Sequence, residues 1–417
     1  MNIRAVRGTK DIFNDDAIKY NYITEIAKRI FENFNYNRII TPIFEETALF
    51  KRGIGEGTDI VEKEMYTFLD KGERSITLRP EGTASVVRAY LEHKIYGNEE
   101  ITKWYYYGPM FRYERPQAGR YREFNQLGVE VLGSKNPKID AEVIYMGYKL
   151  LEKIGISDLR VEINSVGGKE TRLKYRKDLL KYLKDKKENL CNDCQTRYEK
   201  NPLRVLDCKV EKCKEIVKKA PILTEYLSEK EKKHYEEVKR LLNIYNIPFS
   251  ENPKLVRGLD YYSNIVFEVI TEKLGAQGTV LAGGRYDGLI STMGGKDTPA
   301  VGFAAGIERI MLLMNEKKTK KNRIGIVWLG EESSDYALLL ANELRVNNFD
   351  VYMEYEKKSL RAQMKKIDKI NAKYAIIVGE EEVKENKLVV KNLKTGEQIK
   401  IKRDTICEYM KGEINEI

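Results

Sequence analysis

Residues 111–126, FRYERPQAGRYREFNQ, carry more fixed charge than a surface strand needs, with four arginines and two glutamates in sixteen positions. WYYYGPMFR on the N-terminal side and FNQLGVEVLG on the C-terminal side predict strands, and ERPQAGRY between them contains the Pro and Gly of a loop. We therefore expect a β-hairpin with Arg112 and Arg122 on opposite arms near its mouth. Guanidinium groups are planar, permanently charged and able to bond phosphate in pairs. The hairpin thus predicts a polyphosphate site.

The alternative is that these arginines are solvated and paired with Glu114 and Glu123, because exposed ion pairs are common and weak. A second charged segment favours a ligand. In LVRGLDYYSNIVFEV (255–269), Arg257 and Asp260 interrupt an apolar and aromatic pattern that predicts a strand. Charges within such a run need partners or a ligand.

A third arginine lies in AVGFAAGIERIMLL (300–313), which is small and apolar apart from Glu308 and Arg309. This pattern predicts a buried strand that continues into a buried helix. Three separate segments therefore each place an arginine on a mostly buried element, where burial of an unpaired charge costs free energy. One shared anionic site would account for all of them.

Several segments, taken together, resemble a known family. The hairpin is similar to motif 2 of the class II aminoacyl-tRNA synthetases, and GFAAGIERIMLL is similar to their motif 3. LRPEGT (78–83), LVRGLDYY (255–262) and AGGRYDGL (282–289) resemble the signatures of the histidyl-tRNA synthetases, and the last two in this order are the most specific. The resemblance extends from RGTKDI, which starts at Arg7, into the C-terminal domain.

The resemblance implies an α+β catalytic domain of the class II type, built on an antiparallel sheet, over residues 1–322. Within it, the lysine-rich helical stretch from 168 to about 250 is expected to be an insertion. Residues 323–417 follow the connector NEKKTKKN and alternate strand-like runs with helical patterns, which indicates a small α/β domain with a largely parallel sheet and a terminal hairpin. In the family this is the anticodon-binding domain.

The N-terminal region resembles the part of the family that forms the dimer interface, so the resemblance implies a homodimer. Residues 16–34 have helical apolar spacing and lead into RIITPIFEE, a predicted strand interrupted by Pro42. By itself this pattern indicates only that one face is buried. In the family, this helix and strand form motif 1 and the dimer interface.

A histidyl-tRNA synthetase uses ATP to convert L-histidine into histidyl-adenylate, releases pyrophosphate, and transfers histidine to the 3′ end of tRNA(His). Fixed cations suit this reaction because negative charge gathers on the phosphoryl oxygens in the transition state. The positions that match ATP-binding residues are Arg112, Glu114, Arg120, Phe124 and Arg309.

The resemblance implies a role for each of the main ATP contacts. Arg112 would hold the α-phosphate and the substrate carboxylate, and Arg309 would hold the γ-phosphate. Arg257 would reach the α-phosphate from the opposite side, so that Arg112 and Arg257 are the catalytic candidates. Glu114 would accept from the adenine amino group, and Phe124 would stack on the ring. Mg²⁺ would neutralise the outer phosphates.

The positions that match histidine-binding residues are Glu81, Gly82, Thr83, Arg112, Gln126, Glu130, Arg257, Tyr261 and Tyr262. A carboxylate and a phenol, here Glu130 and Tyr262, can bond both imidazole nitrogens, and an analogue that lacks one would leave a buried polar group unpaired. Glu81, Thr83 and Gln126 would hold the α-ammonium group. Because Glu81 lies where a helix is predicted to start, a helix cap is the alternative for this residue.

The resemblance also bears on the tip of the hairpin, which would contact tRNA. One residue of the hairpin departs from the family pattern and lies near the expected adenine site. Arg115 and Gln117 match positions that meet the acceptor end of tRNA. Asn125 stands where many relatives carry histidine, which leaves the geometry of the adenine site open.

Four of the five cysteines lie in the insertion, in CNDC (191–194) and at Cys208 and Cys213. Two close pairs separated by a short spacer resemble a four-thiolate zinc site, and cytosolic thiols are more often ligands than disulfides. The second pair is spaced more widely than is usual, and the chemistry of the family does not require zinc there. The sequence leaves this metal open.

The composition supports a polyanionic partner and argues against several other classes of protein. The 74 Lys and Arg residues exceed the 64 Asp and Glu residues by 10, which fits a polyanionic partner. Only two histidines occur, His93 and His234, so Ser-His-Asp chemistry is not expected. No P-loop, membrane span or signal peptide is recognisable, and we expect a cytoplasmic protein.

Two rival functions stay open. A regulatory paralogue of the synthetase typically lacks the anticodon domain and the second-side arginine, whereas this chain has residues 323–417 and Arg257. A protein that only binds RNA would not explain the apolar, arginine-bearing segment 300–313.

Overall fold

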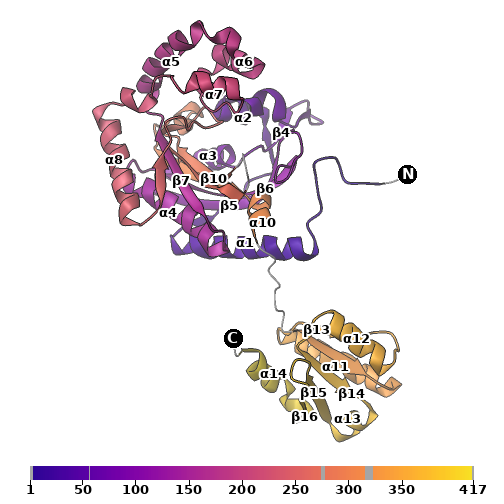
Figure 1. The fold of residues 1–417 in the computed structure, drawn as a ribbon. Helices are drawn as coiled ribbons and strands as arrows, with labels where there is room; N and C mark the ends of the chain where they lie inside the picture. The colour runs from indigo at the N-terminus through magenta and orange to yellow at the C-terminus, as the bar shows by residue number, and fades with distance from the viewer. Residues whose placement is uncertain (1–2, 56, 274–277, 315–322, 416–417) are drawn as a thin grey trace. The chain divides into compact units, whose positions relative to one another are not determined.

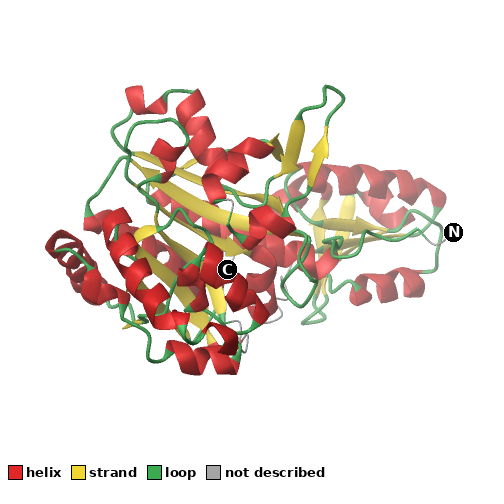
Figure 2. Ribbon diagram, turned by 90° about the horizontal axis from the view of Figure 1, so that it is seen from above, coloured by secondary structure: helices red, strands yellow, loops and turns green. Residues whose placement is uncertain are grey.

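The chain divides into two compact units, Met1–Lys317 and Lys318–Ile417. The computed structural model describes residues 3–55, 57–273, 278–314 and 323–415, so the connector NEKKTKKN lies outside the described residues. Both units combine helices with strands (Figure 2). No helix of the described part is long and apolar enough to cross a membrane.

An eight-stranded sheet forms the centre of the first unit (Figure 1). In spatial order its strands are β1 (Asn37–Arg38), β5 (Thr102–Phe111), β6 (Glu123–Leu132), β11 (Ala300–Gly306), β10 (Thr279–Arg285), β9 (Ser263–Thr271), β7 (Leu159–Ser165) and β8 (Phe249–Glu251). Neighbours from β5 to β7 are antiparallel, whereas β1 and β8 at the edges pair in parallel with β5 and β7. The predicted antiparallel sheet is confirmed.

The two faces of this sheet differ because side chains alternate along each strand. On β6, Leu127, Val129 and Val131 are buried in the largest apolar core, whereas Gln126 and Glu130 belong to the opposite face. The helices that contribute to this core are α1 (Asn14–Asn33), α4 (Pro137–Ile154), α8 (Glu229–Ile244) and α10 (Ile307–Leu313). The other face of the sheet carries polar groups beside smaller apolar clusters, which include Leu132 and Met110.

A small sheet lies between α1 and the hairpin in the sequence, with the order β2 (Phe44–Glu46), β4 (Ser75–Leu78) and β3 (Thr67–Leu69). The strand predicted for RIITPIFEE is divided into β1 and β2, and Pro42, which has no backbone N–H, lies between them. The short helices of this region are α2 (Thr47–Ile54), α3 (Thr83–Glu92) and α9 (Leu289–Thr292). The start of α3 at Thr83 agrees with the predicted helix start.

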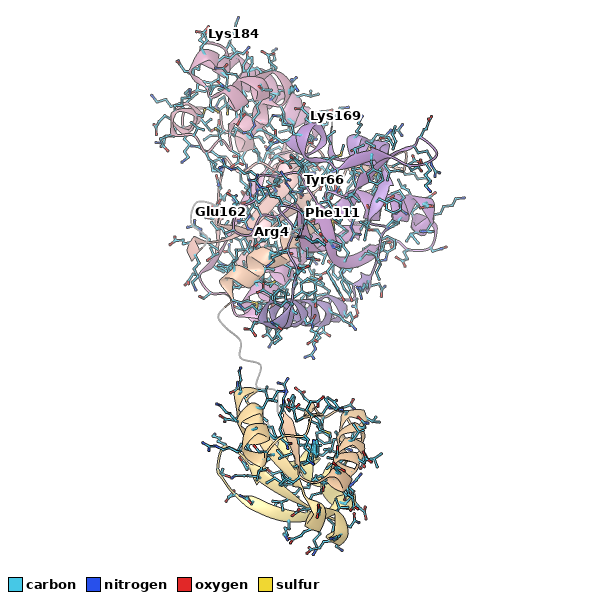
Figure 3. All side chains as sticks on the ribbon, turned by 90° about the vertical axis from the view of Figure 1, so that its right-hand side faces the viewer. Arg4, Tyr66, Phe111, Glu162, Lys169 and Lys184 are labelled. Atoms are coloured by element: carbon cyan, nitrogen blue, oxygen red, sulfur yellow. The ribbon has the colours of Figure 1, made fainter. Side chains whose placement is uncertain are left out.

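The helical insertion predicted from 168 to about 250 has two parts. The first consists of α5 (Lys169–Lys184), α6 (Asn192–Lys200), the 3₁₀ turn η4 (Pro202–Val205) and α7 (Glu211–Val217), which share an apolar core of their own. The second part, α8 and β8, packs against α4 and pairs with β7, so it belongs to the main layer. Figure 3 shows Lys169 and Lys184 at the two ends of α5, with Lys184 at the outer end of the insertion.

The second unit is a five-stranded sheet with helices. Its strands, in spatial order, are β13 (Val351–Met353), β12 (Ile324–Trp328), β14 (Tyr374–Val378), β15 (Lys387–Asn392) and β16 (Gln398–Lys402). β12 is parallel to β13 and β14, and β14, β15 and β16 are antiparallel. The helices are α11 (Glu331–Val346), α12 (Leu360–Lys369), α13 (Glu380–Glu385) and α14 (Ile406–Asn415). The predicted α/β arrangement with a terminal hairpin is confirmed.

One strand prediction is wrong. β9 begins at Ser263, so Arg257 and Asp260 lie in the loop before it rather than inside a strand. Other elements hold this loop: Arg172 Nη1 donates to Tyr262 O at 2.7 Å, and the backbone N of Asp260 donates to Ile54 O at 3.2 Å. These tertiary hydrogen bonds replace a strand ladder and leave the Arg257 side chain outside the regular sheet.

Candidate active site

A cavity of about 370 Å³ lies against the polar face of the long sheet. The predicted site residues that line it are Glu81, Thr83, Arg112, Glu114, Arg120, Phe124, Gln126, Glu130, Arg257, Tyr261, Tyr262 and Arg309. Gly82, Arg115 and Gln117 are not among the described residues that line it. Segments far apart in the sequence, including the hairpin, α3, the loop before β9 and α10, thus meet at one site.

The hairpin brings its charged residues to the edge of the cavity. The backbone N of Arg112 donates to Arg122 O at 2.9 Å, so the two arginines oppose each other at the hairpin mouth as predicted. Arg112 Nε donates to Pro80 O at 2.8 Å, and its Nη1 lies 3.9 Å from Glu114 Oε1. The guanidinium group of Arg122 instead lies over the ring of Tyr113, outside the cavity lining. Arg112 is therefore the arginine of this pair that faces a ligand.

The alternative, in which the arginines of the hairpin pair with glutamates, holds for Glu114. Its Oε2 lies 3.4 Å from Arg120 Nη1, and its Oε1 lies near Arg112. Both contacts are long for ion pairs, and Arg120 remains half exposed, with 43% of its side chain accessible. One carboxylate shared at such distances leaves most guanidinium donors of the two arginines available to an anion.

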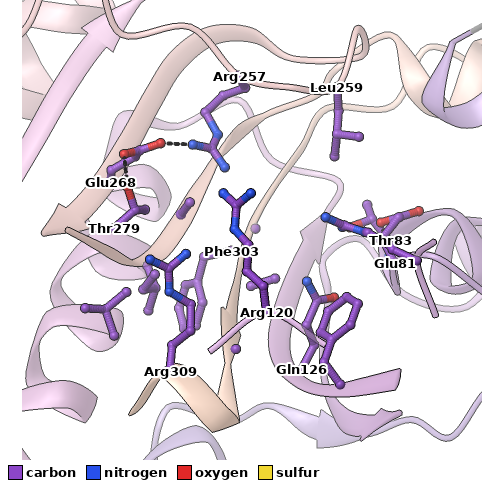
Figure 4. Close-up of a pocket in the computed structure, with 18 of the residues that line it drawn as sticks. Glu81, Thr83, Arg120, Gln126, Arg257, Leu259, Glu268, Thr279, Phe303 and Arg309 are labelled. Carbon is purple, nitrogen blue, oxygen red and sulfur yellow. Dashed lines mark hydrogen bonds and ion pairs between the residues drawn. The ribbon is translucent and has the colours of Figure 1, made fainter. Parts of the chain in front are cut away.

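Arg257 enters the cavity from the side opposite the hairpin (Figure 4). It forms an ion pair with Glu268, whose Oε2 accepts a hydrogen bond from Thr279 Oγ1 at 2.6 Å. Burial is the largest effect and lowers the pKa of Arg257, but the Glu268 carboxylate, Tyr262 and Asp207 together hold the pKa above its usual value. Within the described chain, the buried Nε of Arg257 has no hydrogen-bond partner. The side chain is fixed in position and still has donor capacity.

Arg309, near the start of α10, completes a group of arginines whose guanidinium ends are directed into the same space, as Figure 4 shows for Arg120, Arg257 and Arg309. Burial lowers the pKa of Arg309, and the nearby charge of Arg120 lowers it further. Like charges held together in a partly buried site gain from an anion between them. This electrostatic arrangement favours a polyanionic ligand.

The other end of the cavity is built around Glu130, which is only 1% exposed. Its carboxylate accepts hydrogen bonds from Thr83 Oγ1 at 2.8 Å, Tyr106 OH at 3.2 Å and Tyr286 OH at 2.5 Å. Burial raises the pKa of Glu130 to about 8, against the lowering effect of these hydrogen bonds. The buried carboxyl thus forms a polar centre within a ring of hydroxyl groups.

Glycines make room for this centre. A Cβ on Gly302 would lie 2.0 Å from Glu130 Oε2 and 2.3 Å from Val129 O, and a Cβ on Gly128 would lie 2.5 Å from the hydroxyl of Tyr106. No larger residue fits either strand position without displacing the carboxylate or the phenol. The glycines of these central strands are therefore required by the site.

Glu81 is a helix cap, as the alternative held. Its carboxylate accepts from the backbone N of Thr83 at 2.7 Å and of Ala84 at 2.8 Å, at the first turn of α3. The same residue also lines the cavity, close to the Glu130 centre through Thr83. Beside it, the buried Oε1 of Gln126 has no hydrogen-bond partner in the described part of the chain. Buried acceptors at this end suit a ligand with N–H donors.

Sequence reasoning missed several lining residues. Tyr286 bonds Glu130 directly and packs its ring 5.6 Å from that of Tyr261. It lies in AGGRYDGL, a segment used only as a signature, so its phenol could have been considered as a partner for a buried carboxylate. Asp207 and Lys209 also line the cavity from the insertion, and no pattern in the sequence indicates this contact.

Asn125 has a clear structural role. Its backbone N and Nδ2 both donate to the carboxylate of Glu308, at 3.0 and 2.9 Å, and its Oδ1 accepts from Tyr20 OH at 3.3 Å. Asn125 therefore holds Glu308, which lines the cavity, in place.

Arg115 and Gln117 are exposed at the hairpin tip, where Gln117 and Arg120 form an isolated bridge.

Comparisons with known proteins agree in pointing to one family. A family model described as histidyl-tRNA synthetase matches residues 8–310, and one described as an anticodon-binding domain matches residues 323–413. The histidine–tRNA ligase of Halothermothrix orenii is 49% identical over 98% of this chain and 99% of its own length, and that of Thermoanaerobacter sp. is 49% identical over 99% and 100%. The crystal structure of apo histidyl-tRNA synthetase from Staphylococcus aureus matches with a TM-score of 0.82 and 40% identity, and covers 98% of this chain and 99% of that protein.

Proposed function

The chain belongs to the histidyl-tRNA synthetase family, and on that premise we propose which of its residues carry out the reaction. The activity is the two-step, ATP-dependent attachment of histidine to tRNA(His). One observation carries the assignment of residues: arginines from three separate segments line the same cavity as the buried centre of Glu130. The cavity therefore has one end for a polyphosphate and one for a polar side chain.

At the arginine end, Arg112 and Arg257 approach the α-phosphate of ATP from opposite sides. In the first step a carboxylate oxygen of histidine attacks the α-phosphorus, the bond to the bridging oxygen of the β-phosphate breaks, and pyrophosphate leaves. Charge on the α-phosphoryl oxygens increases during this step, so cations already fixed in position stabilise the transition state. The ion pair of Arg257 with Glu268 supplies this fixed position.

The remaining ATP contacts come from the hairpin and α10. Arg309 binds the γ-phosphate, and Arg120 adds a second cation close to it. Phe124 stacks on adenine, and the guanidinium group of Arg112 lies 5.3 Å from the ring of Phe124, next to the α-phosphate position. Glu114 accepts from the adenine amino group. Synthetases of this family use ATP with Mg²⁺, and Mg²⁺ enters as part of the substrate complex.

At the other end, Glu130 and Tyr262 bond the two ring nitrogens of histidine, with Tyr261 beside them. Tyr286 is added to this group because its hydroxyl donates to Glu130 and orients the carboxylate. Glu81, Thr83 and Gln126 receive the α-ammonium group, for which Gln126 Oε1, without a partner among the described residues, is a suitable acceptor. Gly82 acts indirectly: a Cβ there would lie 2.3 Å from the Tyr106 ring, so only glycine lets Tyr106 approach α3.

In the second step the terminal ribose hydroxyl of tRNA attacks the carbonyl carbon of the adenylate, and AMP leaves. Arg115 and Gln117 at the exposed hairpin tip contact the acceptor end of tRNA. Residues 323–417 bind the anticodon, residues 1–322 form the catalytic domain, and the enzyme acts in the cytoplasm; these remain predictions from the sequence.

Removal of residues 323–417 is expected to leave histidine-dependent ATP–pyrophosphate exchange within about threefold of the full chain and to lower tRNA charging by at least about 10²-fold. The adenylation cavity is lined entirely from residues 81–309, whereas tRNA affinity depends on the number of contacts along the nucleic acid. Exchange and charging are measured side by side on the full and shortened chains. A parallel loss of exchange would mean that the second unit also supports the fold of the first.

A homodimer is expected through motif 1, the helix of residues 16–34 and the segment RIITPIFEE (38–46), together with the neighbouring strand β3. Ile40, Phe44 and Leu69 are 76%, 57% and 67% exposed, an unusual density of large apolar side chains for a free surface. The double change Phe44→Asp and Leu69→Asp should convert the dimer to a monomer in sedimentation velocity. Leu339→Asp, at a residue that is 68% exposed on α11, is the matched control and should leave the dimer intact. A monomeric unchanged chain, or a dimer that survives the double change, would contradict this interface.

The proposed function as a whole is tested by ATP–pyrophosphate exchange with each amino acid in turn. Exchange should require L-histidine and Mg²⁺ and should be followed by charging of tRNA(His). Absence of exchange would favour a regulatory or purely RNA-binding role. Exchange with another amino acid would contradict the assignment of Glu130 and Tyr262.

A further inference from the structure

Four cysteines from two parts of the insertion converge in its small core and are not among the described residues that line the main cavity. Their Sγ atoms, those of Cys191, Cys194, Cys208 and Cys213, all lie within 4.8 Å of one another. Three of the residues are buried, and all four are free thiols rather than disulfides. We propose that this cluster binds one structural zinc ion, and that the ion fixes residues 207–209 against the active-site cavity.

The spacing of the sulfurs fits a tetrahedral metal. Zinc–thiolate bonds of ~2.3 Å place neighbouring sulfurs of a regular tetrahedron ~3.8 Å apart. Cys191 Sγ and Cys208 Sγ are 3.8 Å apart, far beyond the ~2.05 Å of a disulfide bond. Four sulfur ligands in tetrahedral order select zinc or iron, and zinc is the common choice for a closed structural site.

The surroundings of the cluster are also those of a structural site. The cysteine side chains lie in the apolar core shared by α5, α6 and α7, where Leu190, Val205 and Leu206 pack around them. The backbone N of Cys191 donates to Cys213 Sγ at 3.2 Å, and hydrogen bonds of this kind help to orient metal ligands. The described part of the chain adds no other histidine, cysteine or carboxylate to the group, so the set of four is closed.

The position of the ligands in the chain explains what the ion would do. Cys191 and Cys194 lie at the start of α6, whereas Cys208 and Cys213 lie beyond η4 and in α7, so a shared ion ties two helices that are joined by a loop. The insertion core is small, and a metal supplies the stability that such a core lacks.

The bound ion would affect the active site through the residues on either side of Cys208. Asp207 and Lys209 both line the main cavity, so the ligand between them sets where these two charges lie. Near by, Arg204 Nη1 bonds Asp59 at 2.8 Å, and Asn201 bonds Asp260 in the loop that carries Arg257. This second part of the inference rests on the proposed function, whereas the metal assignment does not.

Metal content of the tag-free full chain is the direct test. Inductively coupled plasma mass spectrometry should find one zinc per chain, and Cys194→Ser and Cys213→Ser should each reduce it to near zero. Cys407→Ser, at the one cysteine outside the cluster, is the matched control and should keep the full content. Replacement by Co²⁺ should give the visible spectrum of a tetrahedral tetrathiolate. Zinc-free wild-type chain, bound iron, or a disulfide among the four cysteines would overturn the assignment.

The link to the active site is tested separately. Removal of zinc from wild type with a chelator should lower kcat/KM for exchange by at least about tenfold, since small displacements in a site have large effects on rate. Circular dichroism should show that the main helices persist, and added zinc should restore the rate. Lys209→Ala should retain its zinc and raise the KM for ATP. Full activity of a folded, zinc-free enzyme would overturn this link while leaving the metal site in place.

Discussion

Replacing Arg257 by alanine is expected to lower histidine-dependent ATP–pyrophosphate exchange by about 10³-fold, with a change in the dissociation constant of histidine below about threefold. The magnitude follows from the loss of one preorganised cation that acts on developing charge at a transferring phosphoryl group. Arg257 lines the cavity and is held in position by its ion pair with Glu268, so alanine removes a cation that is already oriented. Steady-state exchange gives kcat, and calorimetric titration gives histidine binding.

The control for Arg257→Ala is Arg240→Ala on α8, where an exposed arginine pairs with Glu237 at the outer surface. This variant should have unchanged kinetics. Thermal melting distinguishes a lost ion pair from a lost catalytic group, because Arg257→Ala also leaves Glu268 without its cation. Equal losses in histidine binding and in turnover would show that Arg257 acts on the bound substrate rather than on the transition state.

Replacing Glu130 by alanine should raise the KM for histidine by at least about 10²-fold and leave the KM for ATP within about threefold. A buried ligand group that loses its polar partner costs about 1–3 kcal/mol, and sites built on such pairs reject substrates by larger factors. Glu130 is 1% exposed and accepts from three hydroxyl groups, so alanine removes a buried acceptor that is already oriented for the imidazole ring.

The change at Glu130 also removes the acceptor of Thr83, Tyr106 and Tyr286, so folding needs its own control. Glu130→Gln keeps the shape and should fold like wild type while still losing histidine affinity. Glu123→Ala, an exposed glutamate on the same strand, should leave both KM values unchanged. A Glu130→Gln enzyme with normal histidine KM would contradict the proposed imidazole contact.

Much of this architecture was predictable from sequence because its signals are local. The β5–β6 hairpin follows from two apolar, strand-like runs around a loop with Pro and Gly, and β11 and α10 follow from a small apolar run. The α/β order of the second unit follows from strands and helices that alternate. The match to family signatures then named the side chains that meet at the cavity.

What the sequence did not predict depends on contacts between distant segments. Arg257 lies in a loop because Arg172 and Ile54 bond its neighbours, a competition that apolar periodicity does not register. The partnership of Tyr286 with Glu130 spans 156 residues, and the approach of Lys209 to the cavity depends on how the insertion core packs. Such contacts follow from tertiary structure rather than from spacing.

The most direct measurement of the central claim is a crystal structure of the protein with L-histidine and a non-hydrolysable ATP analogue. The account predicts one triphosphate contacted by Arg112, Arg257 and Arg309, with the imidazole ring bonded to Glu130 and Tyr262. A nucleotide bound elsewhere, or a triphosphate that leaves Arg257 paired only with Glu268, would contradict it.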